Sequence, residues 1–311
     1  MNELIRVGER TYYFSGPFHI GVYVLDDDIV YKEIKDDKWS QHKKVCLIDS
    51  GLDKTVAKVL DKELEAKGFA VELIINTHYH ADHCGGNKYF QDKYGCRIVS
   101  SKINAALMAN YDICPSVIWG GPPINEIVNN YFYAESSIAD DIENIKLPDG
   151  FWIEDLPGHC ISMLCVKTPD EVIFLGDAVV SRKTLEVNHI SYIYEIGAYL
   201  ESLKKLKGIK ANLYIPYHVE PVKNIKKLVE INYDNVKENI KIIKDICSEP
   251  KTLEEISAEY FTMKNVKLSM YKYAVEGCDI RTYVSYLHNL GELTATNDNN
   301  FIKWGINCCK M

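Results

Sequence analysis

The stretch His78-Tyr79-His80-Ala81-Asp82-His83 decides the interpretation of this chain, because it places three imidazoles and one carboxylate within six residues. It follows residues 71–75, a short apolar run that predicts a buried strand. Side chains at the end of a strand and in the turn beyond it can converge on one point. Imidazole and carboxylate together suit zinc, iron or manganese better than calcium or magnesium. The stretch therefore predicts a metal site at a strand end.

The spacing within the stretch divides its ligands between two ions. His78 and His80 are two residues apart, so they can chelate one ion from the same side of an extended segment. Asp82 and His83 come at the turn into the next predicted helix, residues 86–94, and can reach a second ion. A lone histidine is usually structural, so the prediction needs further ligands elsewhere in the chain.

Three more polar residues follow predicted strands in the same way. His159 follows Pro157-Gly158, Asp177 ends the apolar run of residues 172–176, and His218 follows Pro216-Tyr217. Three separate strand ends that present ligands to one edge are hard to explain by chance. The early strands and the later alternation of strands with helices predict a layered α/β domain.

These motifs, in this order, resemble the signature of the metallo-β-lactamase superfamily, and residues 47–51 match its early Asp-containing motif. The resemblance covers residues 10–220 and implies an αββα sandwich with the site at one edge of its two sheets. It also implies a pair of divalent ions, zinc first, with iron or manganese as alternatives. The implied roles are one ion bound by His78, His80 and His159, a second bound by Asp82, His83 and His218, Asp177 as the bridge, and Asp49 as the residue that orients ligands.

Two positions indicate which branch of that superfamily the chain resembles. Position 177 is Asp, where the antibiotic-degrading zinc enzymes generally have Cys, and position 80 is His, where flavo-diiron oxygen reductases have Glu. Together with Gly85-Gly86-Asn87, they make the chain similar to the glyoxalase II-like hydrolases. One departure is Cys160-Ile161-Ser162-Met163, where relatives often have Thr-Pro-Gly-Ser.

The implied reaction is hydrolysis of an ester, thioester or lactone bond of a small molecule by metal-activated water, with Asp82 and Asp177 as catalytic residues. Four residues are candidates for substrate binding: Trp119, Arg182, His189 and Tyr192. For Trp119, a place in the core or in a homodimer interface is an equal alternative. For Arg182, a solvated surface charge is at least as good an interpretation.

Residues 221–311 form a predicted second module after a catalytic domain at residues 1–220. It contains a long amphipathic helix (222–247), a helix that begins with the capping box of Thr252 and Glu255, a helix at 279–290 and a hairpin (293–296 and 301–304). This order resembles the winged helix of lactamase-β-like proteins, some of which cleave RNA. Residues 251–311 carry seven Lys or Arg against seven Asp or Glu, so no basic face is expected.

Three other functions stay open: an RNA or phosphodiester hydrolase, a mononuclear-iron sulfur dioxygenase and a non-enzymatic nucleic-acid-binding protein.

The whole-chain composition agrees with a cytoplasmic protein that acts on a small molecule. The formal charge is -8 over 311 residues, which gives no general attraction to nucleic acid or anionic lipid. Residues 1–8 lack the basic start and apolar run of an export signal, and we expect no membrane span. The ten irregularly spaced cysteines, including Cys308-Cys309, are therefore expected to be reduced.

Overall fold

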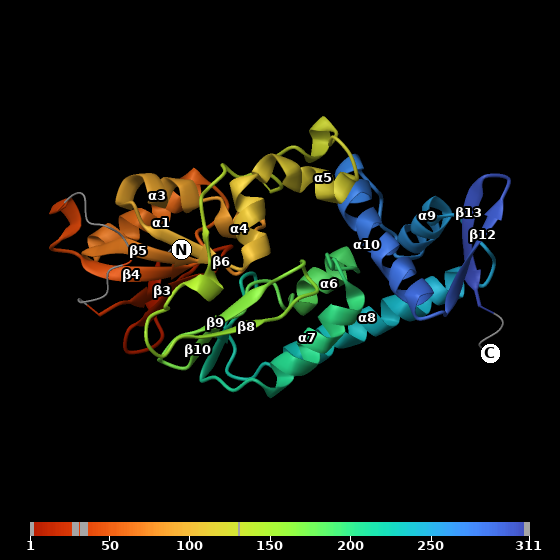
Figure 1. Cartoon of the computed structure of the whole chain (residues 1–311). Helices are drawn as coiled ribbons and strands as arrows, with labels where there is room; N and C mark the ends of the chain where they lie inside the picture. The colour runs from red at the N-terminus through yellow and green to blue at the C-terminus, as the bar shows by residue number, and fades with distance from the viewer. Residues whose placement is uncertain (1–2, 27–30, 32–36, 130, 308–311) are drawn as a thin grey trace. The chain divides into compact units, whose positions relative to one another are not determined.

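A computed structural model describes residues 3–26, 31, 37–129 and 131–307 (Figure 1). Its strands are β1 (Leu4–Arg6), β2 (Thr11–Phe14), β3 (Ile20–Val24), β4 (Lys43–Ile48), β5 (Phe69–Ile75), β6 (Arg97–Ser100), β7 (Asp140–Asp141), β8 (Trp152–Asp155), β9 (Leu164–Lys167), β10 (Val172–Phe174), β11 (Leu213–Ile215), β12 (Leu293–Asp298) and β13 (Phe301–Ile306). Its α-helices are α1 (Lys54–Ala66), α2 (Ala81–Cys84), α3 (Asn87–Tyr94), α4 (Lys102–Ala109), α5 (Cys114–Trp119), α6 (Arg182–Asn188), α7 (Ile196–Gly208), α8 (Lys226–Ile246), α9 (Leu253–Met263) and α10 (Met270–Asn289).

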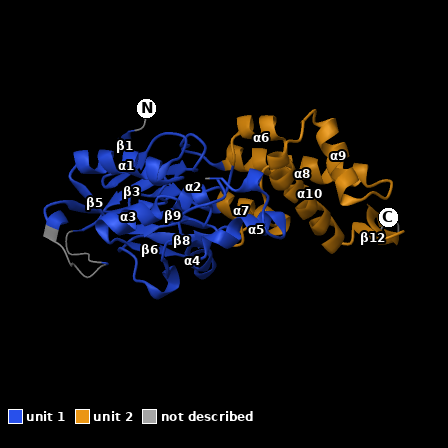
Figure 2. Cartoon of the chain, turned by 90° about the horizontal axis from the view of Figure 1, so that it is seen from above, with its two compact units in different colours: residues 1–156, 162–179, 208–225 blue, residues 157–161, 180–207, 226–311 orange. Residues whose placement is uncertain are grey.

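The chain divides into two compact units, coloured separately in Figure 2. The first comprises residues 1–156, 162–179 and 208–225, and the second comprises residues 157–161, 180–207 and 226–311. The units therefore interleave along the sequence. The domain boundary predicted at residue 220 stays a prediction.

Two sheets form the first unit. One has seven strands in the order β1-β2-β3-β4-β5-β6-β7, antiparallel from β1 to β4 and parallel from β4 to β7. The other has the order β11-β10-β9-β8, with only the β10–β11 pair parallel. The predicted mixed α/β fold is confirmed.

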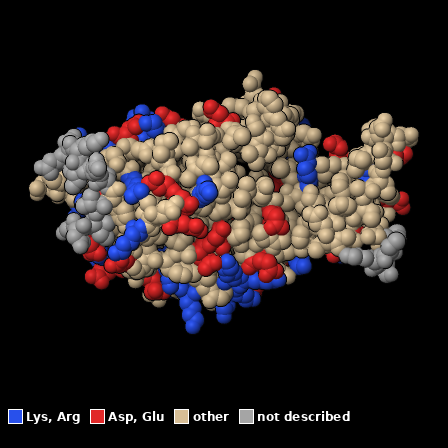
Figure 3. Space-filling view, viewed as in Figure 1, with Lys and Arg blue, Asp and Glu red and all other residues tan. Residues whose placement is uncertain are grey.

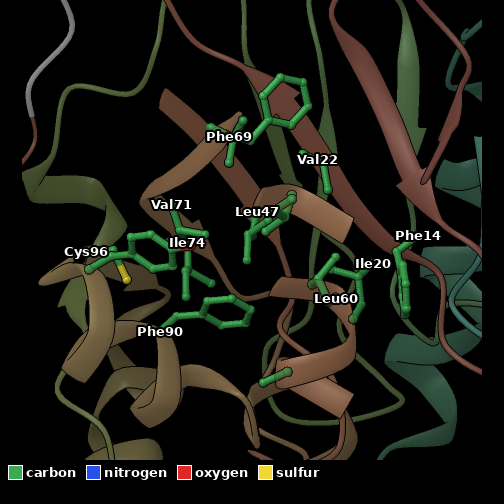
Figure 4. Close-up of a cluster of buried hydrophobic side chains, with 14 of the residues drawn as sticks. Phe14, Ile20, Val22, Leu47, Leu60, Phe69, Val71, Ile74, Phe90 and Cys96 are labelled. Atoms are coloured by element: carbon green, nitrogen blue, oxygen red, sulfur yellow. The ribbon is translucent and has the colours of Figure 1, made fainter. Parts of the chain in front are cut away.

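The seven-stranded sheet is buried on both faces. On one face, Ile48 and Ile75 share a core with Val166 and Phe174 of the other sheet. On the other face, Leu60 of α1 and Phe90 of α3 pack against strand residues such as Leu47 and Ile74 (Figure 4). Burial on both faces explains why β5 is apolar at every position except Glu72 rather than alternating between apolar and polar residues. The site residues that follow β5 therefore start from a rigid strand.

Helices dominate the second unit, where α8 packs against α9 and α10. The predicted stripe of α8 is buried at Leu228, Val229, Val236, Ile243 and Ile246, as helical spacing requires. The capping box at the start of α9 is confirmed: Glu255 N–H donates to Thr252 Oγ1, and Thr252 N–H donates to the Glu255 carboxylate.

Some sequence-based boundaries differ from the structure. The helix predicted at residues 279–290 begins nine residues earlier, at Met270, because Ser269 caps it by accepting the N–H of Lys272. The helix–helix–hairpin order agrees with the prediction, and the winged-helix assignment stays a prediction. The strand predicted at residues 29–34 lies, apart from Tyr31, outside the described residues, as do Cys308 and Cys309. No disulfide joins the eight cysteines within the described ranges.

Candidate metal centre

The predicted ligand stretch begins where β5 ends. His78 lies three residues beyond Ile75, and His80 is the residue before the short helix α2, which contains Asp82 and His83. His83 is fully buried, whereas Asp82 and His80 are half-buried. The ligand stretch therefore lies between the end of the buried strand β5 and the short helix α2, at a strand end as predicted.

Asp49 orients His83 from the neighbouring strand end. The Nδ1 atom of His83 donates to Asp49 Oδ2 at 2.8 Å, and both side chains are buried. The same carboxylate accepts the backbone N–H of Thr77 at 2.7 Å and the Thr77 hydroxyl at 2.8 Å. Because Nδ1 donates, the lone pair of neutral His83 lies on Nε2.

That Nε2 atom is buried and has no hydrogen-bond partner among the described residues. It lies 3.7 Å from Asp82 Oδ2 and 3.5 Å from Asp177 Oδ1. His218 approaches the same carboxylates, with its Nε2 atom 3.0 Å from Asp82 Oδ2 and 3.6 Å from Asp177 Oδ1. One ligand atom from each of these four residues lies within 4.8 Å of the others, so the group could hold a metal ion.

The electrostatics of this group are those of a cation site. Burial acts to lower the pKa of His83, but Asp49, Asp82 and Asp177 outweigh it and raise that pKa well above its usual value. Burial also acts to lower the pKa of His218, but the carboxylates of Asp177 and Asp82 outweigh it and raise that pKa to about 9. Burial acts to raise the pKa of Asp82, but His83 and the hydrogen bond from His218 lower it overall. A buried nitrogen without a partner and two adjacent carboxylates fit a divalent ion with nitrogen and oxygen ligands.

His78 and His80 form the start of the other predicted site. The Nε2 atom of His78 is 3.0 Å from Nδ1 of His80, so a shared proton or a cation would satisfy both nitrogens. The hydroxyl of Thr77 lies 3.1 Å from Nδ1 of His78 and holds the ring from its far side. The third ligand predicted for this ion, His159, belongs to the second unit, and its role stays a prediction.

Two glycines after the stretch allow it to pack against the loop that follows β4. A Cβ atom on Gly85 would lie 1.8 Å from the carbonyl oxygen of Leu52, and one on Gly86 would lie 2.2 Å from that of Ser50. Asn87 then bonds to the side chains of Ser50 and Asn76. These contacts give a structural reason for Gly85-Gly86-Asn87, which the sequence analysis treated only as a family resemblance.

Tyr217 is a site residue that the sequence analysis missed. Its ring stacks on His83, with centroids 3.7 Å apart, and its hydroxyl donates to the backbone carbonyl of Asp82 at 2.5 Å. His218, the next residue, has Nδ1 3.2 Å from the carbonyl oxygen of Pro17, which directs Nε2 toward the carboxylates. The position of Tyr217 beside a predicted ligand was the available signal.

The predicted substrate residues lie in different places. Trp119 is the half-buried last residue of α5 in the first unit. Arg182 and His189 line a pocket of about 340 Å³ in the second unit, and none of the predicted metal ligands lines that pocket. Tyr192 accepts a hydrogen bond from His159 through its backbone carbonyl. Substrate binding by these residues stays a prediction.

The first unit combines two sheets with a group of histidines and aspartates that could hold a metal ion, an arrangement that fits a metal-dependent hydrolase. Residues 39–218 match the metallo-beta-lactamase superfamily. The chain belongs to this superfamily, and it is a metallo-hydrolase of it.

Curated relatives are similar at modest identity. The hydroxyacylglutathione hydrolase of Pelagibacter ubique (strain HTCC1062) is 26% identical over 214 residues, which cover 66% of this chain and 78% of that protein. The hydroxyacylglutathione hydrolase of Hyphomonas neptunium (strain ATCC 15444) is 27% identical over 187 residues, which cover 59% of this chain and 62% of that protein. The atrochrysone carboxyl ACP thioesterase of Aspergillus fumigatus is 25% identical over 190 residues, covering 60% of this chain and 51% of that protein.

Solved structures agree on the fold. A beta-lactamase domain protein from Burkholderia ambifaria has a TM-score of 0.71 at 16% identity, covering 97% of this chain and 94% of that one. A metallo-beta-lactamase family protein from Thermus thermophilus has a TM-score of 0.66, also at 16% identity, covering 98% of each chain. At this identity the similarity is one of fold alone.

Proposed function

We propose that this protein hydrolyses a thioester bond of a small molecule with two divalent metal ions, zinc first, held by His78, His80, His159, Asp82, His83, His218 and Asp177. The observation that carries the proposal is the buried Nε2 atom of His83, which faces two carboxylates and has no hydrogen-bond partner within the described ranges. The names of the relatives support thioesters over the esters and lactones of the same reaction class, since they include hydroxyacylglutathione hydrolases and an ACP thioesterase.

The bound ions would polarise the substrate carbonyl and lower the pKa of water, which is the chemistry that such centres supply. The protein's own residues then have distinct tasks. Asp49 and Thr77 orient the imidazoles. Asp82, whose pKa is lowered, stays ionised at neutral pH and can accept a proton from the attacking water and return it to the leaving thiolate.

Surface charge favours a small molecule over RNA. Acidic side chains are interspersed with basic ones on the face displayed in Figure 3. The chain as a whole has 44 Asp or Glu against 36 Lys or Arg. Binding to a phosphate backbone requires a concentrated basic surface, because most of its affinity comes from phosphate contacts.

The test combines metal analysis with a substrate panel. Protein purified without added metal is analysed for bound metals and assayed with acyl-glutathione and acyl-CoA thioesters, an aryl ester, a lactone and an RNA oligomer. We expect two metal ions per chain and the highest kcat/KM on a thioester. Replacing His80 or Asp177 with Ala should remove metal and turnover together, whereas His288→Ala, which changes an exposed histidine of α10, should retain both.

Three results would overturn the proposal. Thioester turnover by a variant verified to be metal-free would remove the role of the ions. One iron per chain together with oxygen consumption would identify the dioxygenase alternative. Salt-sensitive RNA cleavage without thioester turnover would identify the nuclease.

A further inference from the structure

Two asparagines interrupt the apolar stripe of α8. Asn232 and Asn239 are buried at the same helical spacing as Val229, Val236 and Ile243. A buried amide is unfavourable unless its hydrogen bonds are made. The hydrogen-bond partners of these two asparagines therefore show which segments helix α8 contacts through them. Asn232 bonds to the backbone of Val180 in both directions, at 3.0 Å and 2.9 Å. Asn239 donates to the carbonyl of His189 at 3.2 Å and accepts the hydroxyl of Tyr260 at 2.7 Å.

His189 begins a segment, residues 189–194, that crosses to the start of α7. Its backbone has φ 63°, a left-handed conformation that is unfavourable for a histidine, so the surroundings must hold it in place. The amide groups of Asn235 and Asn239 both donate to its carbonyl oxygen, at 2.9 Å and 3.2 Å. Helix α8 thus fixes one end of the segment 189–194.

Asp279 of α10 fixes the other end. Its side chain is 1% exposed, and its Oδ1 atom accepts the backbone N–H of Ile193 at 3.1 Å. It lies beside Ile280 and near Val284 on the buried face of α10, where an apolar residue would be expected. Burial raises the pKa of this carboxyl well above its usual value. Replacing Asp279 with Asn keeps a side-chain oxygen that can accept the N–H of Ile193.

The centre of the segment holds His159. The Nδ1 atom of His159 donates to the carbonyl oxygen of Tyr192 at 3.1 Å, which places the lone pair of the neutral ring on Nε2. The backbone N–H groups of Tyr194 and Glu195 donate to the carbonyls of His159 and Gly158, at 3.3 Å and 3.0 Å. A hydrogen bond to the second ring nitrogen fixes both the tautomer and the direction of a metal-binding histidine.

We propose that helices α8 and α10 position the metal ligand His159 through the segment 189–194, with Asp279 as the positioning residue. Ile193, whose N–H is held by Asp279, directly follows Tyr192, whose carbonyl holds the imidazole. Helices α8 and α10 thus support His159 within the second unit. The inference rests on the proposed role of His159 as a ligand.

The experiment titrates the full-length, metal-stripped protein with Co²⁺ and follows the visible absorption and the metal-to-protein ratio. Asp279→Ala removes the acceptor for Ile193 N–H. We expect the affinity for one of the two ions to fall about 10-fold, the lower end of the range for a direct partner of a metal-binding histidine, because Asp279 acts through the peptide between Tyr192 and Ile193. Asp279→Asn should restore it to within about threefold. Leu287→Ala, at a fully buried position on the same helix, is the control for general destabilisation. It should lower Tm and leave both affinities unchanged.

The outcomes separate this inference from the proposed function. Unchanged Co²⁺ binding in Asp279→Ala, or an equal loss in Leu287→Ala, overturns the positioning role. If His159→Ala binds two ions with the original affinity, the ligand assignment itself is wrong. If His159→Ala loses an ion and Asp279→Ala does not, only the present inference fails. Should Asp279→Ala not fold, Asp279→Leu, which suits the buried apolar face of α10 and lacks the acceptor, is the second variant, and unchanged affinity in it would overturn the inference as well.

Discussion

Asp49 and His83 are joined by a hydrogen bond of 2.8 Å between two side chains that are both buried. They come from different strand ends, 34 residues apart in the chain. The carboxylate leaves the imidazole one tautomer and directs its Nε2 atom at Asp82 and Asp177. The arrangement of the second predicted metal site therefore depends on Asp49, which is not one of its four predicted ligands Asp82, His83, Asp177 and His218.

Asp49→Asn tests this dependence. An amide in place of the carboxylate removes the charge opposite His83 and one acceptor, so we expect metal affinity to fall about 10- to 100-fold. The measurement is competition with a chelator followed by metal analysis. Asp53→Ala, which removes the acidic residue that caps α1, should reduce stability by about 1 kcal/mol and leave metal affinity unchanged. Equal affinities in the wild type and Asp49→Asn would contradict the orienting role.

Metal removal should destabilise the folded protein. Ions that bind only the folded state stabilise it by about 4 kcal/mol when free metal exceeds Kd a thousandfold. Chelation should therefore lower Tm, and added zinc should restore it in the wild type but not in Asp177→Ala. A Tm that does not respond to chelation in metal-loaded protein would argue against binding at this group.

Gly85→Ala should be strongly destabilising. The added Cβ would meet the carbonyl oxygen of Leu52 at 1.8 Å, and this contact is with backbone that cannot rotate away. We expect a loss of about 3 kcal/mol or more in the free energy of unfolding, at the upper end of overpacking effects. Gly208→Ala, at the end of α7 with no atom within 4 Å of its Cβ, should be neutral or up to about 1 kcal/mol more stable. Urea unfolding compares the two, and similar losses would count against the packing argument.

Tyr217→Phe should separate the stacking of this ring from its hydrogen bond. The variant keeps the ring against His83 but leaves the carbonyl of Asp82 without its donor, which is expected to reduce stability by about 1 kcal/mol. Tyr131→Phe, at a residue 55% exposed, is the control and should have no measurable effect. Metal stoichiometry should be unchanged in both, and loss of an ion in Tyr217→Phe would show that the hydroxyl also holds the site together.

Asp279→Asn should change the pH dependence of stability. Burial raises the pKa of Asp279 well above its usual value in the folded protein, and the nearby carboxylate of Glu276 raises it further. In the unfolded chain the carboxyl ionises above about pH 4, so the wild type loses stability as pH rises, by at most about 1.4 kcal/mol per pH unit. The amide does not titrate. The stability of Asp279→Asn relative to the wild type should therefore be greater at pH 8 than at pH 5 in urea unfolding, and a constant difference would contradict a raised pKa of Asp279.

The sequence by itself determined the family and the candidate ligands. The stretch from His78 to His83 and the residues His159, Asp177 and His218 each follow a predicted strand, and such local patterns can be recognised without coordinates. The strand β5 and the helix α1 were also predictable, because their apolar residues follow the periods of a buried strand and an amphipathic helix.

Only the tertiary structure revealed how those ligands are supported. The family resemblance implied an orienting role for Asp49, but the structure identified His83 and Thr77 as its partners. Tyr217 and the glycines after His83 act through contacts between segments that are distant in sequence, and no local pattern encodes such contacts. Asn239 and Asp279 give a local signal, a polar residue on an apolar helix face, but their partners in the segment 189–194 come from the fold. Hydrogen bonding needs partners within about 3 Å, and only the folded chain brings them that close.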